Sequence, residues 1–545
     1  MKNPTPLQPA KILLLFLLAA LLLSACGSDL WGTSDPYLTP SPLATRTGPG
    51  STATVTAATP TPPFATLVLL PSLTASPLAF FPTLTLTGTA TPANYTAPQG
   101  STISYVSQSG DSLDVVAIHF GVQPSDISSP SPLPATGFIN PGTLLFMPNA
   151  LAQTITTPSQ PILPDSELVD SPSAVGFDIN AYVNSAGGAL STFKDFHPPS
   201  GSQAIISGAE AVRLISIGSS ISPRLLLALI QYYTGWVQGT PRPNLDEVHL
   251  FGYTNTNYNP ATPTLYQPLR PVIQDLLTGY YGWRAGKLST LTFPDGTTMR
   301  IAPGLNAGSV ALQYFFSRHL NYADWLQAID PNTGFLSLFK SMFGDPWERA
   351  SELGPLFPAN LTQPTFILPF EVGALWAFTG GPHPAWEAET AFGALDFAPA
   401  SAVSGCALSN AWVVAVASGQ IVRSENSYVV LDLDGDGFEQ TGWVVLYQHI
   451  GARDRVPVGT WVNAGARLGH PSCEGGEATG TNVHMARKYN GEWVAAGGPI
   501  PFVLSGWTAH AGSAPYQGTL TKGDLTITAN QTGINTSQII RQPGE

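Results

Sequence analysis

The sequence predicts a multidomain α+β protein with a small βααβ unit, a mainly helical middle region and an all-β antiparallel C-terminal domain. Three observations support this fold class. Apolar residues recur at helical spacing in the middle of the chain, and short β-branched or aromatic runs between Gly and Asp-Gly turns follow toward the C-terminus. Stretches rich in Thr, Ser and Pro separate these parts, and 545 residues are enough for several domains.

The composition restricts the possible partners. Only 10% of the residues are charged, and the formal net charge is -13. Binding to phosphate backbones needs clustered Lys and Arg, so this balance argues against a nucleic-acid partner. A carbohydrate or peptide substrate remains compatible with it.

Residues 1–26 have the pattern of a secretory signal. Lys2 and Lys11 precede an apolar run from Ile12 to Leu23, which is shorter than the ~20 residues of a membrane span. The run ends in Leu23 to Gly27, which resembles the bacterial lipobox. This resemblance implies a lipid on Cys26 and a location in the cell envelope, anchored to a membrane on its extracytoplasmic side. The alternative is a plain cleaved signal.

Three further segments are predicted to have no fold of their own. Residues 27–100 are a linker, because Thr52 to Thr96 contains Thr, Pro, Ala and Leu without a charged residue, which favours an extended spacer. Residues 151–200 are predicted as a second linker, and residues 513–545 as a C-terminal tail.

Residues 101–150 contain the predicted βααβ unit. The alternation from Ile103 to Tyr105 predicts a strand, Asp111 or Ser112 is a candidate cap for a helix ending at Phe120, and a second helix is expected near Pro124. The unit closes with a turn and a second strand, from Ile139 to Pro148.

The opening Tyr105 to Leu113 and the closing Ile139 to Pro148 resemble those of LysM modules. The resemblance implies a βααβ fold that binds glycans containing N-acetylglucosamine, including peptidoglycan. His119 is expected to be a surface residue of the first helix.

Residues 201–355 are predicted to be helical. Apolar residues recur at helical spacing from Val212 to Ile217 and from Pro223 to Ile230, with Ser222 as a cap, and again from Leu305 to Phe316. Two of these pieces resemble lysozyme-like lytic transglycosylases. Tyr233 occupies the position of their catalytic Glu, and glycan cleavage needs a carboxylic acid. We therefore predict a non-catalytic, glycan-binding region.

Residues 365–512 change to an all-β pattern. Strands are predicted at Trp412 to Val416, Tyr428 to Leu431, Trp443 to Gln448 and Gly459 to Val462. Five of the nine histidines fall in this region: His383, His449, His470, His484 and His510. Several His with an Asp on a sheet indicate a candidate metal site.

The order of four motifs identifies a possible family. Gly380 to His383 is followed by Ala394 to Pro399, Leu446 to Ile450 and Thr479 to Arg487. This order resembles the lysostaphin-type zinc metallopeptidases, and most closely their beta-lytic branch, in which the first His lies well before the Asp.

The resemblance implies one zinc ion held by His383, Asp396 and His484, with a catalytic role for His449. Asn482 stands where the family has a second catalytic His, on the same strand face as His484. The implied function is a peptidoglycan-binding cell-wall hydrolase, a zinc-dependent endopeptidase acting on the stem or cross-bridge. The alternative, which Asn482 leaves open, is an attenuated wall-binding scaffold or an activator of another hydrolase.

Two smaller patterns remain. Cys406 and Cys473 are the other cysteines of the chain, and a disulfide is favoured over free thiols outside the cytoplasm. Asp432, Asp434 and Asp436 match the first half of a calcium loop, but Trp443 stands where that loop needs a Glu. A tight turn is therefore favoured over calcium. For His470 and His510 we expect structural roles.

Overall fold

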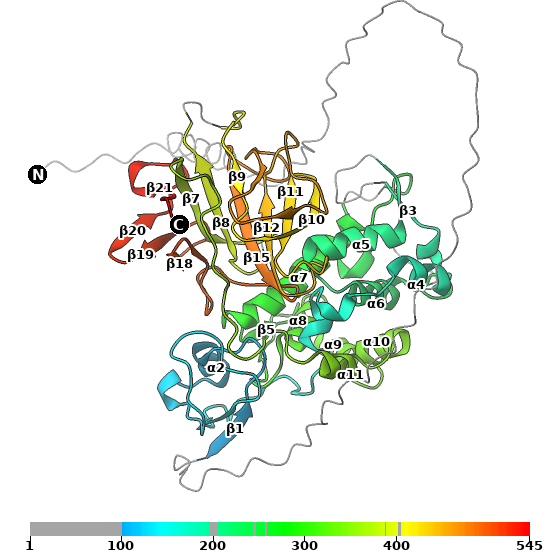
Figure 1. Cartoon of the computed structure of the whole chain (residues 1–545). Coiled ribbons are helices and arrows are strands. Elements are labelled where there is room, and N and C mark those ends of the chain that lie inside the picture. The colour runs from blue at the N-terminus through cyan, green and yellow to red at the C-terminus, as the bar shows by residue number, and fades with distance from the viewer. Residues whose placement is uncertain (1–100, 197–203, 243–246, 257–258, 387–388, 402–404) are drawn as a thin grey trace, which may run out of the picture. The chain divides into compact units, whose positions relative to one another are not determined.

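The computed structural model describes residues 101–196, 204–242, 247–256, 259–386, 389–401 and 405–545 (Figure 1). The predicted signal segment 1–26, with Cys26, and the linker 27–100 lie outside these residues. Within the described ranges, no helix combines the length and the apolar character that crossing a membrane requires.

The N-terminal module consists of β1 (Thr102–Val106), α2 (Leu113–Phe120), the 3-10 turn η1 (Pro124–Asp126) and β2 (Leu144–Pro148), with β1 antiparallel to β2. Ser112 precedes α2, and Gly121 ends it in the left-handed conformation at φ 69°. The predicted second helix is only a 3-10 turn. Three prolines from Pro130 to Pro134 follow it, and proline lacks the amide hydrogen that a longer helix would need.

The prediction that His119 lies on the surface was wrong. The residue is 4% exposed, and its ring stacks on Trp283 with 3.5 Å between ring centres. The sequence shows only that His119 lies outside the apolar face of α2. That side of the helix is covered by another part of the chain.

The middle region is helical, as predicted. Its helices are α3 (Asp165–Leu168), α4 (Ile179–Ala186), α5 (Gly208–Ser219), α6 (Pro223–Thr234), α7 (Tyr266–Arg284), α8 (Ala307–Ser317), α9 (Tyr322–Ile329), α10 (Phe335–Phe343) and α11 (Pro346–Leu353). Between them lie the 3-10 turns η2 (Pro172–Ala174), η3 (Ala189–Ser191) and η4 (Glu247–Gly252), and the strand pairs β3 (Lys194–Asp195) with β4 (Ile206–Ser207) and β5 (Thr290–Thr292) with β6 (Thr298–Arg300).

The prediction of a linker at 151–200 was wrong for the described part of that segment. Helices α3 and α4 lie there, and Leu163, Leu168 and Val183 are buried in the core of the helical region. Around α3 the apolar residues are interrupted by Pro and Ser. In α4, however, Ile179, Tyr182, Val183 and Ala186 recur at helical spacing between Asp178 and Gly187, a signal that the linker prediction overlooked. Burial against the later helices supplies the stabilisation.

A large antiparallel sheet forms the centre of the C-terminal domain. Its strands, in spatial order, are β13 (Trp461–Val462), β10 (Gly419–Glu425), β11 (Tyr428–Asp432), β12 (Trp443–Gln448), β15 (Val483–Tyr489), β8 (Ala394–Pro399), β7 (Leu375–His383) and β21 (Gln538–Ile540) (Figure 1). The short strand β16 (Glu492–Trp493) pairs with β15, and β9 (Val413–Val414) pairs with β14 (Arg467–Gly469).

The C-terminal segment is part of this domain, so the prediction of a tail at 513–545 was wrong. A second sheet contains β17 (Val503–Leu504), β18 (Trp507–Ala511), β19 (Gly518–Lys522) and β20 (Leu525–Thr528), and after the turn η5 (Asn535–Ser537) strand β21 pairs with β7. The segment is rich in Thr, Gly and Gln. Its fold therefore depends on strand pairing more than on an apolar pattern.

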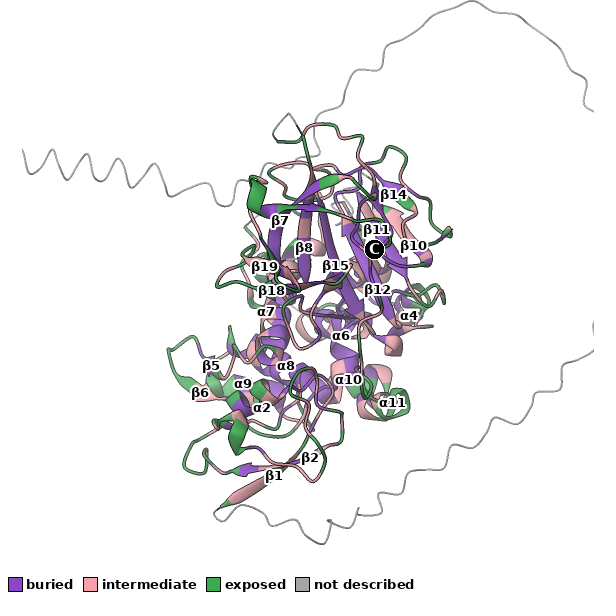
Figure 2. Ribbon diagram, turned by 60° about the vertical axis from the view of Figure 1, so that its left-hand side comes forward, coloured by how far each residue is buried: buried purple, intermediate pink, exposed green. Residues whose placement is uncertain are grey.

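Alternate side chains of the central sheet enter two different cores, because successive residues of a strand face opposite sides. On β8, Leu395 packs inside the β domain, whereas Ala394 packs against the helical region. Asp396 lies on the side of Ala394. On β15, Ala486 also packs against the helical region, and His484 lies on its side. Most of these strand residues are buried (Figure 2).

Candidate metal centre

Three neighbouring strands carry the residues of the centre. His383 ends β7, Asp396 lies within β8, and His484 is the second residue of β15. Asp396 and His484 are directly opposite each other in the strand register. Gly380 faces Asp396, and a Cβ there would lie 2.5 Å from the Asp396 carboxylate. The glycine thus leaves room for the carboxylate to turn toward the two histidines.

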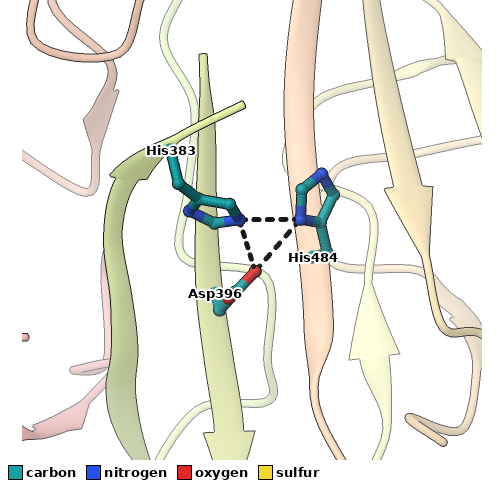
Figure 3. A group of neighbouring side chains, drawn as sticks. All are labelled: His383, Asp396 and His484. Carbon is teal, nitrogen blue, oxygen red and sulfur yellow. Dashed lines mark hydrogen bonds and ion pairs between the residues drawn. The ribbon is translucent and has the colours of Figure 1, made fainter. Parts of the chain in front are cut away.

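The side chains converge on one point (Figure 3). His383 Nε2 lies 2.9 Å from His484 Nδ1, and Asp396 Oδ1 lies 3.3 Å from the first nitrogen and 3.2 Å from the second. His383 is 1% and His484 7% exposed. The structure therefore brings together the three residues that the sequence predicted as metal ligands.

The hydrogen bonds of the two rings determine which nitrogens face the centre. His383 Nδ1 lies 2.8 Å from the Gly381 carbonyl, and His484 Nε2 lies 3.1 Å from the Ala385 carbonyl. A carbonyl only accepts, so these two nitrogens carry the hydrogens. In the neutral rings the opposite nitrogens then present lone pairs to each other.

Asp396 completes a set of three electron-pair donors. The carboxylate Oδ1 is buried and accepts no hydrogen bond. Two lone pairs and an anionic oxygen within 3.3 Å of one another are stabilised by a cation between them. Two imidazoles and a carboxylate suit zinc.

His449 lies beside this set, directly after β12. Its backbone has a φ of 66°, which is uncommon for a residue other than glycine. Nδ1 donates to the Glu474 carbonyl at 2.8 Å, and the ring centre lies 6.4 Å from that of His484. Burial lowers the pKa of His449. The ring is therefore neutral near pH 7, with a lone pair on Nε2.

Asn482 precedes β15 and is not bonded to the centre by any hydrogen bond found among the described residues. Its Nδ2 donates to the Gly480 carbonyl at 2.8 Å, and its Oδ1 is buried without a hydrogen-bond partner. A buried amide oxygen without a partner is costly.

Cys406 and Cys473 form a disulfide, which confirms the favoured prediction, with 5.6 Å between their Cα atoms. The bond joins two loops beside the centre. The Gly405 carbonyl accepts from the Thr481 amide at 3.1 Å, and the Ser472 amide donates to the His449 carbonyl at 2.7 Å. The disulfide thus supports the loops next to Asn482 and His449.

Two contacts of the centre were not predicted. The ring of Tyr516 stacks on His383 with 4.1 Å between ring centres, and the Tyr516 carbonyl accepts from the Gly381 amide at 2.9 Å. The Ala385 carbonyl orients His484. A lone Tyr in a segment without a motif, and a backbone carbonyl, leave no signal in a single sequence.

The acidic turn Asp432, Asp434 and Asp436 can bring three carboxylate oxygens within 4.8 Å of one another. The same carboxylates serve the turn itself. Asp432 accepts from the Gly437 amide at 2.9 Å, and Asp436 accepts from the Thr441 hydroxyl at 2.7 Å. These hydrogen bonds account for the motif as a tight turn.

Tyr233 of α6 has no acidic neighbour in hydrogen-bond contact among the described residues. Its hydroxyl lies 2.5 Å from His319 Nε2, and burial raises the pKa of Tyr233 well above its usual value. A phenol that keeps its proton so firmly is a poor general acid. His470 and His510 hydrogen-bond to the Ala411 carbonyl and the Thr521 hydroxyl, as structural residues do.

Comparison with known proteins gives two kinds of similarity. Residues 161–359 match the family model of the LasA N-terminal domain. The chain is also similar to solved structures of M23 metallopeptidases. Pseudoalterin, a deep-sea M23 metalloprotease, is 22% identical over 31% of this chain and 96% of its own, with a TM-score of 0.26. Comparison with curated proteins found no match.

Two other structures show similarity of the same kind. The catalytic domain of lysostaphin, an antimicrobial peptidase from Staphylococcus simulans, is 22% identical over 23% of this chain and 89% of its own, with a TM-score of 0.17. A zinc-containing peptidase from Vibrio cholerae is 18% identical over 26% of this chain and 41% of its own, with a TM-score of 0.17.

Proposed function

We propose that this protein is a zinc-dependent endopeptidase that cleaves peptide bonds in the stem or cross-bridge of peptidoglycan. One observation carries the proposal: a lone pair of His383, a lone pair of His484 and the buried carboxylate oxygen of Asp396 face one another at 2.9 to 3.3 Å. Three protein ligands are the usual number at a catalytic zinc.

When bound, zinc supplies Lewis acidity toward a peptide carbonyl and makes water acidic enough to act near neutral pH. His449 then has a defined part. Its Nδ1 donates to the Glu474 carbonyl, so Nε2 is the atom that accepts a proton during attack and returns it to the leaving amine. Its lowered pKa keeps this base unprotonated at neutral pH.

Peptidoglycan is proposed as the substrate from the sequence motifs. The order of His383, Asp396, His449 and His484 is that of lysostaphin-type enzymes. The LysM-like motifs of residues 101–150 support binding to wall glycans, and the lipobox-like residues around Cys26 support a lipid anchor on the outer side of a membrane. These properties together describe a wall hydrolase tethered in the cell envelope.

A second candidate function is a wall-binding scaffold, or an activator of another hydrolase. Asn482 favours it. An amide cannot take up a proton as a histidine does, and the Nδ2 of Asn482 already donates to the Gly480 carbonyl.

The deciding experiment measures zinc content and release of peptides from purified peptidoglycan by the protein and by His484→Ala. The enzyme predicts about one zinc per chain, peptide release that stops with a chelator, and loss of both in His484→Ala. Zinc without any peptide release would favour the scaffold. Unchanged zinc content in His484→Ala would contradict the assigned ligands.

A further inference from the structure

The loop between β7 and β8 joins two of the proposed ligand strands and lies against the third. It follows His383 and ends before Ala394. Its residue Ala385 is fully buried, and the Ala385 carbonyl accepts from His484 Nε2 at 3.1 Å. A ligating histidine depends on such a partner, because the partner selects the tautomer and holds the ring plane.

The loop is closed on itself by two hydrogen bonds. The Ala385 amide donates to the Ala391 carbonyl at 2.9 Å, and the Trp386 amide donates to the Thr390 hydroxyl at 3.1 Å. The position of the Ala385 carbonyl is therefore tied to those of Trp386, Thr390 and Ala391. A contact that fixes these residues therefore also fixes the carbonyl that orients the ring of His484.

The outer side of the loop is held by the helical region. The Trp386 indole lies over Gly218 of α5, where a Cβ would be 3.3 Å from its ring. The Glu389 carboxylate accepts from the Thr278 hydroxyl of α7 at 3.3 Å. The ammonium group of Lys287 lies 4.3 Å from the centre of the Phe392 ring.

The contacts of Glu389 and Trp386 differ in strength. Glu389 is exposed, so its hydrogen bond to Thr278 competes with water. Trp386 is partly buried and packs against the core of the helical region, to which Ala385 also belongs. The indole is therefore the main attachment of the loop to α5, and Gly218 is the residue that makes room for it.

We infer that the helical region positions the metal centre by holding Trp386, and through it the Ala385 carbonyl that orients His484. This inference rests on the proposed zinc site. Trp386 is a positioning residue, because it acts on His484 through the Ala385 carbonyl. Zinc affinity in the C-terminal domain then depends on a contact with α5.

The test titrates zinc into the metal-free full chain against a chromogenic chelator. Trp386→Ala should weaken zinc binding about 10- to 100-fold, the usual effect of losing the support of a ligand. Gly218→Leu should weaken it similarly, since its side chain would displace the indole. In the double variant the leucine meets no indole, so the combined loss should not exceed that of Trp386→Ala. Trp386→Phe keeps a ring over Gly218 and should restore most of the affinity.

The matched control is Trp236→Ala. Trp236 is also part of the core of the helical region, and its ring packs against Phe193. This variant should lose stability and keep the zinc affinity of the parent. Parental zinc affinity in a folded Trp386→Ala protein would overturn the inference and leave the zinc site intact. A parent that binds no zinc would remove the proposed function and this inference together.

Discussion

At the scale of single residues, the centre depends on which nitrogen of each ring carries the hydrogen. Gly381, Ala385 and Glu474 each offer a carbonyl to one nitrogen of His383, His484 and His449, respectively. Backbone carbonyls thus direct all three lone pairs. The chemistry of the site is therefore set as much by loop conformation as by the identity of the histidines.

Asn482 is the residue that separates an enzyme from a scaffold. Replacing Asn482 by His should raise the rate of peptide release by about 10² to 10³, the usual value of one transition-state donor or proton carrier. The imidazole is close in size to the amide, so the fold should persist. The measurement compares the two proteins at equal zinc occupancy.

The rates of the parent and of Asn482→His distinguish three cases. A large increase supports an attenuated enzyme. A parent that is as fast as the His variant would mean that Asn482 is itself an adapted catalytic residue. No release by either zinc-loaded protein would support the scaffold.

At the scale of elements, helix α2 of the N-terminal module docks on α7 through His119. The ring stacks on Trp283, and its Nε2 lies 3.1 Å from the Trp283 carbonyl. Burial lowers the pKa of His119 to about 3. In the unfolded chain the pKa of histidine is about 6.5.

This difference predicts a loss of stability in acid. Between about pH 6.5 and pH 3 the unfolded chain binds a proton on His119 that the folded protein does not, so stability falls as the pH falls through this window. His119→Gln keeps an amide donor and removes the titration. Its melting temperature should fall less than that of the parent between about pH 7 and pH 4.5. Equal falls would show that His119 does not contribute.

The disulfide between Cys406 and Cys473 also stabilises the packing of the loops, because it joins two segments that are 67 residues apart in the sequence. Replacing Cys406 and Cys473 together by Ser should lower the free energy of unfolding by about 2–4 kcal/mol. Denaturant unfolding with and without a reductant measures this effect. The reductant should destabilise the parent to the level of the double variant and leave that variant unchanged. A parent that is insensitive to complete reduction would contradict the prediction.

At the scale of the whole described chain, Arg284 joins the three parts. Its guanidinium donates to the Ser109 carbonyl of the module, and it forms ion pairs with Asp165 at 2.9 Å and Glu492 at 3.0 Å. The Arg284, Asp165 and Glu492 side chains are only 12%, 11% and 3% exposed. Removal of the guanidinium should cost much stability, because the carboxylates of Asp165 and Glu492 would then stay buried without a cation.

Arg284→Ala should therefore lower the free energy of unfolding by about 3–5 kcal/mol. The matched control is Arg213→Ala, which removes an ion pair with Glu210 whose side chains are 43% and 32% exposed. The control should cost at most about 1 kcal/mol. Equal losses in the two variants, measured by denaturant unfolding, would show that Arg284 does not act as a buried junction.

Several features followed from local patterns in the chain. The residues from Trp443 to Gln448 form β12, α6 begins at Pro223, and Gly121 ends α2. Ser222 stands at the cap position of α6, but its side chain makes no capping hydrogen bond. The three candidate ligands also came from motifs that occur in a fixed order along the chain. Local propensity and periodicity depend only on neighbours along the chain, so one sequence reveals them.

Other features arose from contacts between distant segments. His119 is buried because Trp283 of α7 stacks on its ring. Strand β21 forms because it pairs with the edge of β7. Trp386 packs on α5 because Gly218 leaves room for its indole. The helices of 151–200 likewise depend on a core built by later residues. Such contacts depend on which surfaces meet after folding. The residue pattern of one segment does not reveal which other segment will pack against it. The candidate ligand residues can thus be recognised in the sequence, whereas the contacts that orient their side chains form only in the folded molecule.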